Sequence, residues 1–215
     1  DGVEIPAQFL RTAAWPDGSV RWLLADFQVD LPASGTASLI ARTGQAPRPV
    51  QGITVTDQAG RITVDTRAAV FTFKKSEFLV AGLPFEVVSG GRTHRAVPAS
   101  GGWTVEEKGP MKAVLRIDGG WKPSLRNALV RFKARIFFFR DRSDLRVALT
   151  FRNNNSYGWE PGAQPELALS GAGFGISLLS PAGRYVFGGG VEKTWDLAVP
   201  PSGGPETLES RYLEN

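Results

Sequence analysis

Apolar and polar positions alternate with a period of two along much of this chain, which predicts β-strands that bury one face. Residues 129–139 show the alternation most clearly, and residues 145–152 repeat it after a polar turn at 141–144. The apolar positions are Val130, Phe132, Ala134, Ile136 and Phe138 in the first segment and Leu145, Val147, Leu149 and Phe151 in the second. We therefore expect a central antiparallel hairpin whose other face is solvated and basic.

A turn followed by a strand lies near the start of the sequence. Pro16, Asp17 and Gly18 suit a tight turn, because proline fixes φ, aspartate caps its own backbone and glycine accepts positive φ. Strands are predicted at 19–29 and 36–42. Residues 43–49 are rich in Gly, Pro and polar residues, so we place a domain boundary there.

Between this boundary and the central hairpin, the pattern predicts short strands separated by turns. Residues 53–56 and 61–65 are expected to form a hairpin, and residues 90–102 a loop that carries His94. Further strands are predicted at 69–74, 85–88, 103–108 and 111–118.

Residues after the central hairpin alternate less regularly. Residues 153–161 are expected to form a polar, aromatic loop, and residues 171–179 and 183–187 a last hairpin. Residues 200–205 are typical of a linker. The charged segment that ends the sequence has the composition of a helix start, which suggests a truncated chain.

Composition supports an all-β fold. The chain has 25 Gly and 15 Pro, and its apolar runs are short and bounded by turn residues. We predict a small N-terminal barrel-like domain, residues 1–48, packed beside a larger antiparallel β-sandwich, residues 49–215. The absence of cysteine excludes disulfides and thiolate metal sites, and is compatible with an exported or a cytoplasmic bacterial protein. No apolar run has the eighteen or so residues of a membrane span, so we expect no membrane partner.

Positive charge is concentrated around the central hairpin. Residues 110–160 hold eleven basic and four acidic residues, a net charge of +7 in a chain of net charge +4. A basic sheet face attracts polyanions, either nucleic acid or acidic polysaccharide. No nucleic-acid-binding motif is present, which favours the polysaccharide. The candidate substrate-binding residues are Arg131, Lys133, Arg135, Arg146, Arg152, Trp121 and Trp159.

In this interpretation arginine pairs with uronate carboxylates, while aromatic rings in the flanking loops stack on sugars. The alternative is an ordinary solvated strand face with tryptophans that cover a sheet end, as many β-proteins have. The sequence favours that alternative for the charges taken alone.

Two stretches resemble the exo-rhamnogalacturonan lyase and YetA-like family. Trp15–Phe27, Trp-Pro-Asp-Gly-Ser-Val-Arg-Trp-Leu-Leu-Ala-Asp-Phe, is similar to the family's N-terminal barrel-like domain. Residues 108–116, Lys-Gly-Pro-Met-Lys-Ala-Val-Leu-Arg, with the strand pair that ends at Phe151, resemble its central β-sandwich. The resemblance covers about three quarters of the chain. It implies an accessory region of a polysaccharide lyase, whose α/α toroid is absent from this sequence and would complete the active site.

Uronate β-elimination needs a cation to offset the carboxylate charge and a base to remove the C5 proton. The candidate bases are His94, which lies between arginines, and Tyr157. A lone histidine in a glycine-bounded loop is more often simply solvated. We therefore leave the catalytic residues unassigned and expect them in the missing region, with this chain alone inactive.

Other chemistry is not indicated. Asp17, Asp141 and Asp144 are more typical of turns than of a calcium site, and we expect neither a metal nor another cofactor. Two further functions stay open: a non-catalytic carbohydrate-binding module, and an assembly component whose exposed strands pair with neighbours.

Overall fold

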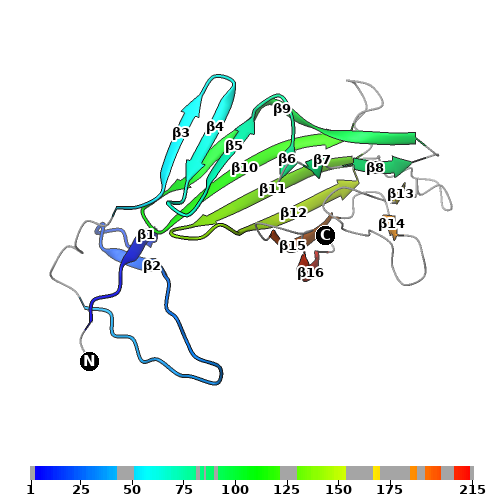
Figure 1. Cartoon of the computed structure of the whole chain (residues 1–215). Coiled ribbons are helices and arrows are strands. Elements are labelled where there is room, and N and C mark those ends of the chain that lie inside the picture. The colour runs from blue at the N-terminus through cyan, green and yellow to red at the C-terminus, as the bar shows by residue number, and fades with distance from the viewer. Residues whose placement is uncertain are drawn as a thin grey trace.

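The chain is an all-β protein in our computed structural model, as its sequence predicts (Figure 1). The structure describes residues 3–42, 51–80, 83–84, 86–89, 92–121 and 130–153, and strands at 167–169, 185–187, 192–199 and 206–213. Side-chain environments are described for residues 3–42, 51–79, 95–120 and 131–150.

A seven-stranded antiparallel sheet forms the larger layer. Its strand order is β16-β15-β12-β11-β10-β9-β8. These strands are β8 (Glu86–Ser89), β9 (Arg92–Lys108), β10 (Lys112–Trp121), β11 (Val130–Phe139), β12 (Leu145–Asn153), β15 (Glu192–Val199) and β16 (Glu206–Leu213). The predicted central hairpin is therefore confirmed as β11 and β12, which pair from Val130 opposite Asn153 to Phe138 opposite Leu145.

A three-stranded sheet lies beside the long strands in Figure 1. It contains β3 (Thr54–Gln58), β4 (Arg61–Asp65) and β5 (Val70–Lys74), joined in sequence order. The predicted hairpin at 53–65 and strand at 69–74 are thus confirmed. Two short pairs complete the described strands after residue 50: β6 (Leu79–Val80) with β7 (Leu83–Pro84), and β13 (Leu167–Leu169) with β14 (Tyr185–Phe187).

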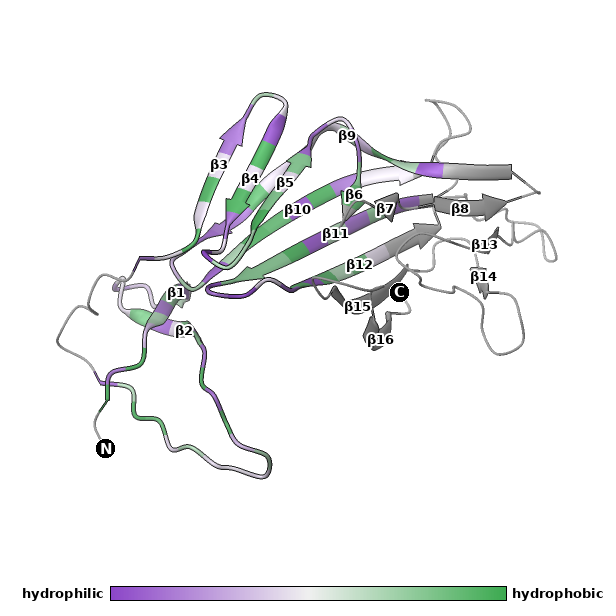
Figure 2. Cartoon of the chain, viewed as in Figure 1, coloured by the Kyte–Doolittle hydropathy of each residue, from purple (hydrophilic) through white to green (hydrophobic). Residues whose placement is uncertain are grey.

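The two sheets bury a continuous apolar core between them, which makes this part of the chain a β-sandwich. Phe73 on β5 packs against Trp103 on β9 and Phe138 on β11, with ring centroids 5.5 and 5.8 Å apart. Phe78 stacks on Phe132. The predicted inward row of β11 is confirmed from Phe132 to Phe138, and Figure 2 shows the alternation along the long strands. We call this buried side of the seven-stranded sheet the inner face and its opposite side the outer face.

Four sequence predictions differ from the structure. Residues 90–102 were expected to be a loop, but residues 92–108 form the single strand β9, with a bulge at 99–102 and positive φ at Gly101. Residues 36–42 form no strand. The C-terminal segment, expected to be helical, is strand β16. Tyr185–Phe187 pairs with Leu167–Leu169, and the predicted partner at 171–179 lies outside the described residues.

Before residue 43 the structure describes one hairpin, β1 (Ala7–Ala14) with β2 (Val20–Phe27). Its turn is confirmed: Gly18 has φ +84°, and the Asp17 carboxylate accepts a hydrogen bond from the Ser19 backbone N–H at 2.9 Å. The assignment of these residues to a barrel-like domain stays a prediction, as does the boundary at residue 48.

Buried polar contacts fasten this hairpin to the sandwich. The side-chain oxygen of Gln8 accepts hydrogen bonds from the backbone N–H groups of Met111 and Lys112, at 2.9 and 3.0 Å, and its amide donates to Glu107. The Lys112 ammonium lies 2.7 Å from Asp26 and 3.2 Å from Glu107. We call these side chains, Gln8, Asp26, Glu107 and Lys112, the anchor cluster.

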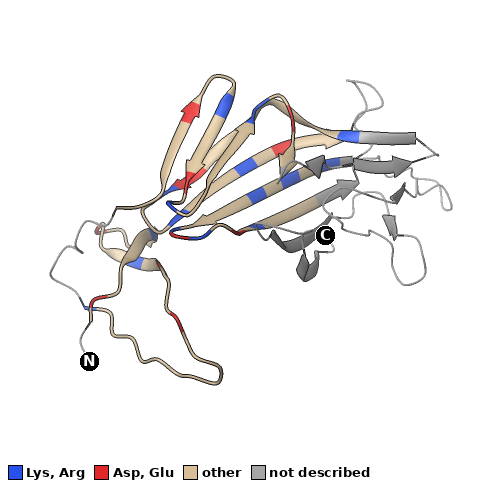
Figure 3. Cartoon of the chain, in the orientation of Figure 1, with Lys and Arg blue, Asp and Glu red and all other residues tan. Residues whose placement is uncertain are grey.

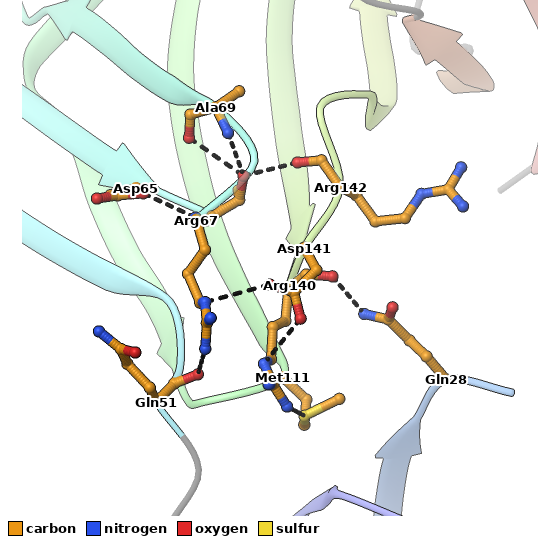
Figure 4. Close-up of polar contacts among 10 residues, drawn as sticks. Gln28, Gln51, Asp65, Arg67, Ala69, Met111, Arg140, Asp141 and Arg142 are labelled. Carbon is orange, nitrogen blue, oxygen red and sulfur yellow. Dashed lines mark hydrogen bonds and ion pairs between the residues drawn. The ribbon is translucent and has the colours of Figure 1, made fainter.

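A second junction joins the turn between β4 and β5 to the turn between β11 and β12 (Figure 4). The Thr66 hydroxyl donates to the carbonyl oxygen of Arg142 at 2.6 Å, and the Arg67 guanidinium lies 3.2 Å from the Asp141 carboxylate. Both Arg67 and Asp141 have positive φ, a backbone conformation that side chains other than glycine rarely adopt. Gln28, just after β2, donates to the carbonyl oxygen of Arg140, so this junction also holds the hairpin.

Replacing Lys112 should loosen the anchor cluster. In Lys112→Met, two largely buried carboxylates lose their cation, and breaking such a pair costs about 3 kcal/mol of unfolding free energy. Urea unfolding measures this loss, and hydrogen exchange should increase first in β1 and β2. The control Lys74→Met removes an exposed ion pair with Glu77 and should cost no more than about 0.5 kcal/mol. Equal costs for the two variants contradict the role of the cluster.

Candidate basic binding face

Charged residues recur along adjacent strands of the seven-stranded sheet (Figure 3), and the register places many of them on its outer face. Seven of them, five basic and two acidic, form a group on strands β9 to β12 away from the anchor cluster. They are Arg116 and Asp118 on β10, Arg131, Lys133 and Arg135 on β11, Arg146 on β12, and Glu106 on β9. We call these seven residues the basic face.

Glu106 lies between two arginines of neighbouring strands. Arg135 donates to its two carboxylate oxygens from Nε and Nη2, at 2.7 and 3.2 Å, and Arg116 adds a contact at 3.1 Å. Arg116 and Arg135 are directly opposite in the register of β10 and β11. Like charges in that arrangement repel, so the carboxylate stabilises the strand pair.

These ion pairs shift the pKa values of Glu106 and Arg116. The hydrogen bond from Arg135 is the main cause that lowers the pKa of Glu106 from its ordinary 4.5. Asp118, whose carboxylate lies 2.8 Å from the Arg116 Nε, raises the pKa of that guanidinium. Glu106 and Arg116 are therefore both charged at neutral pH.

A β-bulge determines where Glu106 lies. Val105 pairs with Leu115 and Glu107 pairs with Val114, so Glu106 is an extra residue on β9. The extra residue shifts the alternation and lets two consecutive glutamates reach the outer face. Glu107 joins the anchor cluster, while Glu106 binds the arginines.

Arg131 and Lys133 differ from the paired arginines. Both side chains are exposed, and neither forms an ion pair with any residue that the structure describes. Lys133 is opposite Asp118 in the register, yet the nearest cation to that carboxylate is Arg116. Arg131 is opposite Gly120, so no side chain lies beside it at that position of β10.

Arg146 is the last of the predicted binding cations whose side chain the structure describes. It is opposite Phe137, and its guanidinium lies 5.6 Å from the ring centroid, a cation–π contact. The structure thus brings together Arg131, Lys133, Arg135 and Arg146 on one face, as the alternation predicts.

The other predicted site residues are placed only in part. Arg152 is opposite Arg131 in the backbone register, Trp121 is opposite Val130, and His94 is paired with Val87 at the edge of the sheet. The structure does not describe the side chains of these three. Tyr157 and Trp159 lie outside the described residues.

Part of the predicted +7 region is not on this face. Lys112 is buried in the anchor cluster, and Arg140 and Arg142 lie at the β11–β12 turn, paired with Asp141 and Asp144. The positive charge is therefore less concentrated than the sequence count indicates.

Sequence reasoning missed Glu106, because it lies outside the segment in which charges were counted. One signal was available: Glu106 and Glu107 are adjacent within an otherwise alternating stretch, and two adjacent charges in a strand indicate a bulge. In the described part of the chain, no three His, Asp or Glu side chains gather as a metal site. The same part contains no helix that is long and apolar enough to cross a membrane.

The lowered pKa of Glu106 predicts an acid-dependent loss of stability. A carboxylate whose folded pKa lies below its unfolded value stabilises the protein above about pH 4.5, and this contribution disappears as the pH falls through the folded value. Between pH 6 and pH 3, the melting temperature of the wild type should therefore fall further than that of Glu106→Gln, which cannot ionise. Parallel melting curves for the two proteins contradict the assignment.

Part of the chain is similar in sequence to a known bacterial protein. No protein-family model matches the chain. It is 26% identical over 132 residues to the uncharacterised protein YetA of Bacillus subtilis, a match that covers 50% of this chain and 15% of YetA. The match gives weak support to the YetA-like part of the resemblance noted in the sequence, and the rhamnogalacturonan-lyase part stays a prediction.

Proposed function

We propose that the basic face binds an acidic glycan, with uronate carboxylates paired to Arg131 and Lys133. The observation that supports this proposal is that both cations are exposed and have no ion-pair partner among the described residues. They are two residues apart on one strand face, about 7 Å along the strand, so one extended ligand can contact both. An arginine fork suits a carboxylate because it donates two parallel hydrogen bonds.

The surroundings of these cations favour an extended, flat ligand. Gly120 lies beside Arg131, and the small side chains of Ala148 and Thr150 lie opposite Arg135 and Lys133 on β12. A carbohydrate chain can therefore approach the sheet closely. A duplex nucleic acid is less suitable, because no element of the described sheet projects far enough to enter a groove.

In this proposal the chain is the glycan-binding β-sandwich region of a polysaccharide lyase that resembles the exo-rhamnogalacturonan lyases. Another region of a longer protein completes the active site. The YetA match, which spans 15% of that relative, is compatible with such an arrangement.

Binding of oligogalacturonate or rhamnogalacturonan oligosaccharides, measured by calorimetry at low salt, tests the proposal. The double variant Arg131→Ala, Lys133→Ala should bind about tenfold more weakly, since each exposed ion pair contributes about 0.7 kcal/mol. The matched control removes Arg61 and Lys74, an exposed cation pair that is opposite in register on the other sheet, and should change affinity less than about twofold. Equal losses in both variants, or no uronate binding by the wild type, contradict the proposal.

A second candidate function, an assembly component whose copies associate through the hairpin, is supported by the apolar surface of β1 and β2. Thirteen of the fifteen large apolar side chains that the described residues expose precede residue 43. They are Val3, Phe9, Leu10, Trp15, Val20, Trp22, Leu23, Leu24, Phe27, Val29, Leu31, Leu39 and Ile40.

The size of this surface is comparable with an interface between two copies. Four of the side chains are aromatic and about half exposed, and leave about 400 Å² of apolar area in water. That is half of the roughly 800 Å² that each partner buries in a stable interface, before the aliphatic side chains are added. Neither edge of the hairpin is paired with another described strand, so backbone pairing is also available.

Light scattering over a range of protein concentrations tests this candidate. The wild type should self-associate, and Trp22→Ser with Leu23→Ser, which reduces apolar area on both hairpin faces, should shift it towards monomer. Val70→Ser is the control, because Val70 is equally exposed but lies on β5 in the sandwich. A wild type that stays monomeric at all concentrations contradicts the assembly function.

A further inference from the structure

The basic face has two halves that differ in how their cations are paired. Arg131 and Lys133 have no ion-pair partner among the described residues, whereas Arg116 and Arg135 share the Glu106 carboxylate. The two halves are continuous, because Lys133 and Arg135 are successive outward residues of β11. Arg131 and Arg135 are four residues apart, about 13 Å along the strand.

Glu106 is placed where an acidic ligand of this face would put a carboxylate. Its two oxygens accept hydrogen bonds from Nε and Nη2 of Arg135, and one of them also contacts Arg116. The side chain is 24% exposed, so water and ligand can reach it. The β9 bulge places it on the outer face beside Glu107, where regular alternation would turn one of two consecutive residues into the core.

We propose that Glu106 is an internal counterion that occupies Arg135 and shares Arg116 with Asp118, so that an acidic ligand gains Arg135 only by displacing the Glu106 carboxylate. This inference rests on the proposed function. A short ligand with one carboxylate binds at Arg131 and Lys133 and leaves the pairing at Glu106 intact. A longer ligand with carboxylates about 13 Å apart reaches both halves, and it competes with Glu106 for Arg135.

Glu106 therefore sets the selectivity of the face for chain length and charge density. Its negative charge also repels anionic groups that approach the paired half, which disfavours ligands with sparse charge. Removing the charge should strengthen binding of a long oligouronate more than binding of a monouronate.

The decisive variant is Glu106→Gln, which keeps the size of the side chain and an oxygen that accepts from Arg135. We expect it to bind a long oligogalacturonate about fivefold more tightly than the wild type, and a monouronate with an affinity within about twofold. The affinity should also fall more steeply with salt, because more cations contact the ligand. The matched control is Glu77→Gln, which makes the same charge change beside Lys74, away from the basic face.

Arg135→Gln completes a double-mutant cycle. In the wild-type background it should change affinity less than about twofold, because Arg135 is already paired with Glu106. In the Glu106→Gln background it should cancel the gain. The cycle also keeps the test valid if one of the single variants folds poorly. Melting curves of each variant will show whether it folds.

The outcomes separate this inference from the proposed function. Uronate binding that depends on Arg131 and Lys133 but does not change in Glu106→Gln overturns only the counterion role. An equal gain in Glu77→Gln overturns it too, because net charge then explains the effect. A large loss in Arg135→Gln alone means that the ligand already contacts Arg135, which also overturns it. Absence of uronate binding in the wild type overturns both proposals.

Discussion

Burial of the inner face of the seven-stranded sheet determines where the other side chains of that sheet lie. Phe132, Ala134, Ile136 and Phe138 are at most 3% exposed, and they meet Phe73 and Trp103 in the core. A shift of one residue in β11 would bring Arg131, Lys133 and Arg135 into this core. Burying unpaired charges is so unfavourable that the register is unambiguous. The apolar row thus positions the basic face without any contact to it.

The hairpin is held by a different kind of interaction. Apolar contacts are not directional, so they fix the distance of a hairpin from a sandwich better than its orientation. The anchor cluster is directional, since the Gln8 amide binds two backbone N–H groups and Glu107, while Lys112 lies between two carboxylates. With the Gln28 contact at the second junction, these bonds orient β1 and β2 although most of their apolar side chains are exposed.

The sequence predicted the fold class and the two faces of the central hairpin because every second residue is apolar over 130–138 and 145–151. It failed at residues 90–102, where glycine and proline suggested a loop. There a bulge with positive φ at Gly101 lets the strand continue. The sequence prediction also failed at residues 36–42. Alternation shows that a segment is suited to a strand, but it does not show that another strand is present to pair with it. The pairing of Glu106 with two arginines depends on three strands meeting in register, which no local pattern reveals.

The single extra residue in β9 links the anchor cluster to the paired arginines of the basic face. Because of it, Glu106 serves the arginines and Glu107 serves the hairpin anchor, side by side on one face. Deleting one residue at this point would restore regular alternation and leave a single outward carboxylate for the two roles. In the evolution of related chains, the two glutamates should therefore be inherited as a unit. A gap here should accompany changes at Gln8 and Lys112 as well as at Arg116 and Arg135.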